Sequence, residues 1–443
     1  MDFLFNIPYV LRVLLSLVVI MAFNKLLKQL LVSLILGTLC LALWCGHSFD
    51  TIGAIAFARA FELDNLLLML LVAQVIWLST QMDKTGTMTE LVDTVKSLVS
   101  QRTAMAVLPA VIGLLPMPGG AIFSAPLVDD CDREKIIDPL LKTRINYWFR
   151  HLWEYWWPLY PGVLMAIAIT GLPMTTFMLL QLPLSFLSVL SGYIFLLRKV
   201  RKSPAPENDK KRAALKKIFT LIRPILVIIT VYLLIRLFLP GLATVNKYLP
   251  MISGIFVAQL VLQRNRPLAF SDWQKSGRRS LTISGWRKIL FSKKALDMAV
   301  LAGIIRVYGA FIEAQLADGT LLMGHVRDEL GSWNIPILLV IILIPFISGI
   351  TTGIAIGFVG AGFPIVMMLM GNSPTYGTLL STTLLAYASG YMGMLLSPVH
   401  VCLIVTNEHF KTSLPASIFK LVRPALVVIG GAIALSLLIN AIM

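Results

Sequence analysis

Long apolar runs alternate with short polar segments along the whole chain. An α-helix needs about 20 mostly apolar residues to cross roughly 30 Å of hydrocarbon. Runs of this kind predict ten crossings, at 8–23, 28–46, 64–82, 152–171, 173–197, 217–239, 248–263, 297–316, 375–406 and 419–441. We therefore expect an all-α integral membrane protein of the cytoplasmic (inner) membrane with about ten transmembrane helices.

Two further apolar runs, 103–128 and 335–369, are interrupted near their centres. The interrupting residues are Pro116, Pro118, Gly119 and Gly120 in the first run, and Gly349, Thr351, Thr352 and Gly353 in the second. Each limb is too short to cross the bilayer alone. Interrupted apolar segments of this kind predict re-entrant hairpins, whose tips must be covered by protein or line a cavity.

The order of these elements repeats. Residues 1–198 contain three spans, the hairpin 103–128, a helix broken by proline at 147–171 and a final span. Residues 217–443 contain the same series, with the hairpin at 335–369 and the broken helix at 375–406, after a basic linker at 199–216. An odd number of full crossings predicts that the second copy is inverted. Inverted repeats with broken helices are typical of secondary transporters, whose site lies at the midplane.

Composition agrees with a membrane protein. Hydrophobic residues make up 57% of the 443 residues and charged residues only 14%, against about 25% charged in soluble domains. This excludes a soluble enzyme, a secreted disulfide scaffold and a disordered chain. The four cysteines show no metal-ligand spacing, so no metal site is predicted.

The net charge of +16 arises largely from two basic segments, 198–217 and 264–294. Basic loops are typical of the cytoplasmic side. This places both termini outside the cytoplasm, and no nucleic-acid-binding motif accompanies the charge.

Helices that end inside a membrane leave backbone groups without partners. Half-helices should begin near Gly120, after Gly353, after Pro158–Pro161 and after Pro398. The N-terminal end of a helix carries partial positive charge and binds anions. The carbonyl ends of the opposite limbs offer a place for Na⁺ as a candidate coupling ion, and no cofactor is predicted. Side chains at the breaks complete a predicted substrate site, namely Pro118, Gly119, Gly120, Ser124, Thr351, Thr352, Gly353, Ser397 and His400.

Charged residues within apolar segments are candidates for ion coupling, because isolated charges are costly in a membrane. His151 and Glu154 stand three residues apart in the aromatic segment 147–161, which is also typical of an interfacial anchor. His400 is a second candidate for a coupling proton, or a structural histidine. Arg306 and Glu313 lie seven residues apart on one helix face, where they pair with each other, pair with Asp83, or compensate substrate charge.

Three motifs carry a resemblance to a known family. They are the run Met117–Pro126, the segment Trp148–Gly162 and Ser397–His400. The chain resembles an uncharacterised prokaryotic membrane family that is grouped with the ion transporter superfamily, alongside gluconate, citrate and dicarboxylate permeases. The resemblance implies inverted repeats, two re-entrant hairpins, a homodimer, and elevator-type alternating access with H⁺ or Na⁺. The Ser-Asn-Thr hairpin tips of the divalent anion/sodium symporters are absent.

These features predict a secondary active transporter of a small anionic organic solute, coupled to H⁺ or Na⁺. A cation/proton antiporter that uses Glu313, Glu154 and His400 is the alternative, and a passive anion channel is a further one. No HExxH or GxSxG motif is present, so no catalytic residue and no enzymatic activity are predicted.

Overall fold

The computed structural model describes residues 7–116, 120–132, 134–201, 211–264, 281–316, 318–371 and 373–443. Helices form nearly all of the regular structure in these ranges, and the β-pairing found there is one isolated bridge between Gln315 and Leu321. The predicted all-α class is confirmed for this part of the chain.

The described residues of the first half of the chain form eleven helical elements. They are α2 (Tyr9–Leu27), α3 (Leu30–Trp44), α4 (Phe49–Ala60), α5 (Leu63–Lys84), α6 (Thr87–Lys96), α7 (Gln101–Gly113), α8 (Ala121–Cys131), α9 (Pro139–Arg150), α10 (Pro161–Thr170), α11 (Met174–Phe195) and the 3₁₀ turn η1 (Leu197–Lys199). Local chemistry fixes several starts: Ser48, Ser100 and Asp138 accept a backbone N–H at the beginning of α4, α7 and α9.

The second half follows a similar order. Its elements are α12 (Lys211–Leu221), α13 (Arg223–Phe238), α14 (Pro240–Val245), α15 (Leu249–Arg264), α17 (Ile283–Leu290), α18 (Lys293–Glu313), α19 (Leu322–Ser332), α20 (Ile337–Thr352), α21 (Ala355–Leu369), α22 (Tyr376–Leu395), α23 (Val401–Phe410) and α24 (Leu414–Ile442). The short helices α4, α6, α17 and α19 were not predicted, since their apolar runs are too short for the 20-residue criterion.

Five helical segments are long and apolar enough to cross a membrane: α2, α5, α11 with η1, α17 with α18, and α24. Two bent pairs, α12–α13 and α19–α20, raise this number to at most seven among the described residues. Large apolar side chains such as Phe186 on α11 and Phe419 on α24 are mostly exposed, as expected for surfaces that face lipid. The chain is therefore an all-helical, multi-pass membrane protein.

Helices α7 and α8 pack against each other, as do α20 and α21, at the two predicted hairpins. At a rise of 1.5 Å per residue, α7 and α8 are only about 20 and 16 Å long. The predicted crossing at 152–171 differs from the structure, because α9 ends at Arg150 and a turn at 151–160 precedes α10. Pro158 and Pro161 explain this break, since proline cannot donate within a helix.

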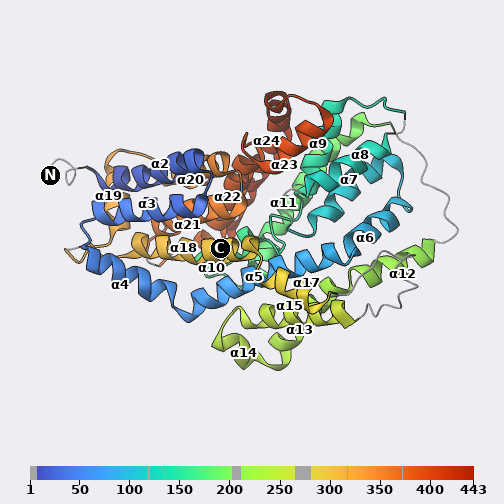
Figure 1. Ribbon diagram of the computed structural model, residues 1–443. Coiled ribbons are helices and arrows are strands. Elements are labelled where there is room, and N and C mark those ends of the chain that lie inside the picture. Colours follow the sequence, from blue (N-terminus) through green and yellow to red (C-terminus); the bar gives the residue numbers. More distant parts are fainter. Residues whose placement is uncertain are drawn as a thin grey trace.

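The broken helices of each half contact the hairpin of the other half. Helix α10 packs on α21, and α23 packs on both α8 and α9. In Figure 1 the hairpin α7–α8 lies toward the right, α20–α21 lies toward the left, and the broken helices lie between them. Chain segments far apart in sequence therefore bring their interrupted ends to one central region.

Candidate functional site

A cavity of about 160 Å³ lies where the interrupted helices meet. Helices α10, α21 and α23 all begin at its wall, at Pro161, Ala355 and Val401. Small residues permit this close approach: a Cβ atom at Gly162 would lie 2.6 Å from the Cβ of Ala355. The helix breaks of both halves of the chain therefore border one shared cavity.

The amide ends that surround the cavity have no side-chain partners within the described part of the chain. Tyr160, Ile354 and His400 occupy the N-cap positions of α10, α21 and α23, and none of them accepts a capping hydrogen bond with its side chain. Each of these helix starts leaves backbone N–H groups without an intrahelical acceptor. The wall is therefore electropositive at three separate places.

The carbonyl ends, by contrast, do have donors. Trp153 Nε1 donates to the carbonyl of Ala110 over 2.7 Å, Trp157 Nε1 donates to Leu114 over 3.1 Å, and the Tyr160 hydroxyl donates to Gly113. The aromatic segment 147–161 therefore satisfies the C-terminal end of α7. This explains its composition, because buried indole and phenol groups combine apolar bulk with one donor each.

The carbonyl end of α20, in the second hairpin, is also satisfied by side chains. Ser397 Oγ donates to the carbonyl of Ile350 over 2.5 Å, and His400 Nδ1 lies 2.6 Å from the carbonyl of Gly353. Gly353 has a φ of +65°, a conformation that favours glycine. The carbonyls that were predicted to bind Na⁺ thus already accept hydrogen bonds from side chains.

Two histidines meet beside the cavity. His151 Nε2 lies 3.1 Å from His400 Nε2, although the residues are 249 positions apart. His151 Nδ1 lies 2.6 Å from the carbonyl of Tyr147, so both rings are anchored to backbone through their other nitrogen. The rings stand at 71° to each other, and the Tyr147 ring contacts both of them.

Three further polar side chains complete the wall. Arg150 Nη1 lies 3.5 Å from Cys402 Sγ, and Glu154 Oε1 lies 3.8 Å from His151 Nε2. All of these groups are buried. The side chains of His151, His400 and Cys402 offer ligand atoms within 4.8 Å of one another, a donor set of the kind that transition metals bind. The adjacent guanidinium and three helix N-termini oppose a divalent cation at this place.

A larger cleft of about 1080 Å³ adjoins the cavity. The two share Met298, Ile354 and Val401 as lining residues. Three lysines of the cleft wall, Lys25, Lys28 and Lys293, give it a basic lining that attracts anions.

A comparison with protein-family models gives one match over nearly the whole chain. The model described as "Protein of unknown function (DUF401)" matches residues 10–443. The chain belongs to the DUF401 family. None of the curated proteins matches the chain.

In this DUF401 protein, five of the nine predicted substrate residues lie at the cavity, at the larger cleft or beside Arg150. Gly353 and His400 line the cavity. Thr351 and Thr352 line the larger cleft instead, and their hydroxyls donate to carbonyls of their own helix. Gly120 begins α8 and allows the guanidinium of Arg150 to lie against it, since a Cβ at this position would clash with the guanidinium.

The remaining predicted residues lie elsewhere. Pro118 and Gly119 are outside the described residues. Ser397 positions the break by its bond to Ile350. Ser124 is fully buried, and its hydroxyl has no hydrogen-bond partner among the described residues. Neither serine is among the residues that line the cavity.

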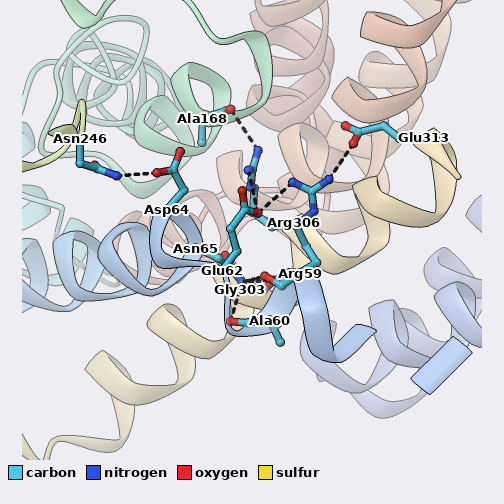
Figure 2. Close-up of polar contacts among 10 residues, drawn as sticks. All are labelled: Arg59, Ala60, Glu62, Asp64, Asn65, Ala168, Asn246, Gly303, Arg306 and Glu313. Carbon is cyan, nitrogen blue, oxygen red and sulfur yellow. Dashed lines mark hydrogen bonds and ion pairs between the residues drawn. The ribbon is translucent and has the colours of Figure 1, made fainter. Parts of the chain in front are cut away.

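Of the four predicted coupling residues, His151 and Glu154 line the cavity. Arg306 and Glu313 do not pair with each other or with Asp83. Figure 2 shows that Glu313 pairs with Arg59 at 2.9 Å, while Arg306 lies 3.8 Å from Glu62 and donates to the carbonyl of Ala168. The predicted pairing was wrong because Arg59 on α4 and Glu62, in the connection between α4 and α5, approach α18 from outside its own helix.

This ion-pair cluster is remote from the cavity. Arg306 contacts the C-terminal turn of α10, seven residues beyond Pro161, which corresponds to about 10 Å along the helix. In the same region the Asn246 amide donates to the Asp64 carboxylate, so the start of α5 and the connection before α15 meet there.

Arg150 and Cys402 are two residues of the cavity wall with reactive or charged side chains that sequence reasoning missed. Arg150 stands next to His151 in the aromatic segment, so a buried arginine there was a usable signal. No local signal marked Cys402, because it reaches the site only through the packing of α23 on α9.

Proposed function

We propose that this DUF401 protein is a secondary active transporter of a small anionic organic solute, coupled to H⁺ or Na⁺. The observation that carries the proposal is the asymmetry of the broken helices. Their carbonyl ends are satisfied by aromatic, serine and histidine side chains, whereas three amide ends face the 160 Å³ cavity without a side-chain cap among the described residues.

An anion fits these surroundings physically. Each helix start carries roughly +0.5 of an elementary charge, and anions bind at such ends through backbone N–H groups. Arg150, which is always protonated, adds a full positive charge at the wall. A volume of 160 Å³ limits the solute to a few carbon atoms with one or two charged groups.

Alternating access is supported by the paired order of the elements. The contact of α10 with α21 corresponds to that of α23 with α8, and the contact of α2 with α3 corresponds to that of α13 with α15. Under the proposal these pairs belong to two inverted repeats within ten crossings, and one repeat's half-helix closes on the other's hairpin. Under the proposal the larger cleft, which shares lining residues with the cavity and carries three lysines, is the route by which the anion enters from one side. An elevator movement and a homodimer, both implied by the resemblance to ion transporter superfamily members, are part of the same proposal.

The cation/proton antiporter is less compatible with this arrangement. Glu313, one of its three proposed carboxylate or imidazole groups, is in an ion pair with Arg59 and is not among the residues that line the cavity. Helix N-termini and Arg150 also repel a cation, as Coulomb's law requires in a medium of low dielectric constant.

The test begins with binding. We expect one or more organic acids from a panel of mono-, di- and tricarboxylates, sulfonates and phosphonates to raise the apparent melting temperature of the purified protein. The Arg150→Gln variant should lose at least tenfold in affinity, because the anion would lose a buried charged partner. Arg59→Gln is the matched control and should bind as the wild type does.

Transport then separates the alternatives. The protein in liposomes should accumulate the selected anion against its gradient when a pH or Na⁺ gradient is imposed. Uptake that only equilibrates the anion, whatever gradient is imposed, would indicate a channel. The proposal fails if none of the anions binds and no anion gradient is built.

A further inference from the structure

The hydrogen bonds of His151 and His400 fix which nitrogen of each ring carries the hydrogen. A backbone carbonyl can only accept a hydrogen bond. Because Nδ1 of His151 lies 2.6 Å from the Tyr147 carbonyl, and Nδ1 of His400 lies 2.6 Å from the Gly353 carbonyl, both Nδ1 atoms must carry the hydrogen. In a neutral imidazole the other nitrogen is then an acceptor with a lone pair.

Two such lone pairs face each other at the pair, since the Nε2 atoms are 3.1 Å apart. Two acceptors repel at that distance, but one added proton turns the contact into a charge-assisted hydrogen bond. We propose that a proton binds between His151 and His400, and that its binding is linked to anion binding in the adjoining cavity. The second half of this statement rests on the proposed function.

Charged groups around the pair explain the linkage. Arg150 from α9 and Glu154 from the following turn line the same cavity. When Glu154 is ionised its charge cancels that of Arg150, so an anion alone or a proton alone at the pair leaves a net buried charge, which is costly. An anion and a proton together leave the site neutral. Each ligand therefore increases the affinity for the other, as linkage requires.

The other groups that face the pair do not supply a compensating fixed charge. Helix α9 contributes the phenol ring of Tyr147, and α22 contributes Tyr391, whose hydroxyl donates to the carbonyl of His151. The turn before α10 contributes Tyr160 to the cavity wall, and α23 contributes the thiol of Cys402, which forms a hydrogen bond with the His151 ring. Helices α5 and α18 contribute only the apolar side chains of Ile76 and Met298 there.

The donor atoms also discriminate between coupling ions. Na⁺ prefers several hard oxygen ligands, whereas the two imidazole nitrogens and the Cys402 sulfur outnumber the one nearby carboxylate, that of Glu154. The carbonyl oxygens nearest to the pair already accept hydrogen bonds from its Nδ1 atoms. This arrangement favours H⁺ over Na⁺.

The first test observes the proton directly. The chain has five histidines, so protein labelled with ¹⁵N at histidine alone, in lipid bilayers, gives a tractable solid-state NMR spectrum. Acidification from about pH 8 to pH 5, the range in which imidazoles titrate, should convert two ring signals together into a hydrogen-bonded imidazolium–imidazole pair. His400→Gln should abolish this pair signal, and His409→Gln, on an exposed position, should keep it.

Folding is checked by size-exclusion chromatography, and His151→Gln removes the other member of the pair if His400→Gln is not monodisperse. Two results would overturn the proton site. One is a pair that stays neutral through the titration, with or without saturating anion. The other is about one bound zinc ion per chain by inductively coupled plasma mass spectrometry, since a metal ion would then occupy the pair.

The second test measures the linkage. If one proton enters with each anion, the dissociation constant of the selected carboxylate should rise tenfold per pH unit at pH values where the free pair is neutral. His400→Gln should flatten this dependence, and His409→Gln should not. A wild-type affinity that is independent of pH overturns the linkage and leaves the proposed function standing. Absence of any anion binding refutes the proposed function, while the NMR titration still decides the proton site.

Discussion

Gly162→Ala is the substitution that tests most directly how the cavity is built. The added Cβ would lie 2.6 Å from the Cβ of Ala355 and 3.2 Å from the amide nitrogen of Ile356. Carbon atoms in contact are normally 3.5–4.0 Å apart. The starts of α10 and α21 must therefore separate by about 1 Å, because the neighbours are a Cβ and backbone atoms, which cannot rotate away.

This separation has two measurable costs. Overpacking of a tight contact destabilises proteins by about 1–3 kcal/mol. A shift of about 1 Å also misplaces the amide groups that would hold the anion, and misplacement on this scale costs up to about a hundredfold in function. We therefore expect a lower apparent melting temperature in detergent and a tenfold to hundredfold weaker affinity for the selected anion.

Gly430→Ala provides the matched control. Gly430 lies inside α24, and a Cβ there would have no atom of the described residues within 4 Å. This variant should be unchanged or slightly more stable, by up to about 1 kcal/mol, because alanine favours the helix. If Gly162→Ala matches Gly430→Ala in both melting temperature and anion affinity, the two helix starts do not form the binding wall.

Three other substitutions probe the surroundings of the cavity. Trp153→Phe removes the donor to the Ala110 carbonyl, so it should lower stability by about 1–3 kcal/mol; an unchanged melting temperature would show that the indole bond is dispensable. Ser124→Ala should be neutral or slightly stabilising, because the buried hydroxyl has no partner among the described residues; lost anion binding in the folded variant would contradict this. Arg59→Ala removes the partner of Glu313, yet this partly exposed pair should contribute at most about 1 kcal/mol, less at high salt; a larger loss, measured by thermal unfolding at low and high salt, would refute that estimate.

The positions where helices start and stop were largely predictable. The expected half-helix starts near Gly120, Pro161, Gly353 and Pro398 agree with α8, α10, α21 and α23 to within about three residues. These boundaries depend on local chemistry, since proline lacks an amide hydrogen and glycine permits a positive φ. Apolar run length likewise predicted the all-helical membrane class, because the thickness of the bilayer sets the length of a crossing helix.

Polar partners were not predictable in the same way. The expected pairing of Arg306 with Glu313 followed from their spacing on one helix, but in the structure Glu62 and Arg59 approach from neighbouring segments. Sequence spacing describes contacts within a helix, whereas a charged side chain pairs with whatever group the packing of other segments brings within reach.

The contact between His151 and His400 likewise separates what the sequence determined from what the packing determined. The sequence by itself determined that the chain is a helical membrane protein, where its helices break, and that each of the two proline-broken helices carries a histidine. Only the packing of α9, α22 and α23 decided that the two rings touch across 249 residues, that Cys402 and Arg150 join them, and that tryptophans close the carbonyl ends. Helix boundaries arise from the few residues around them, whereas a cavity arises from the way separate helices cross.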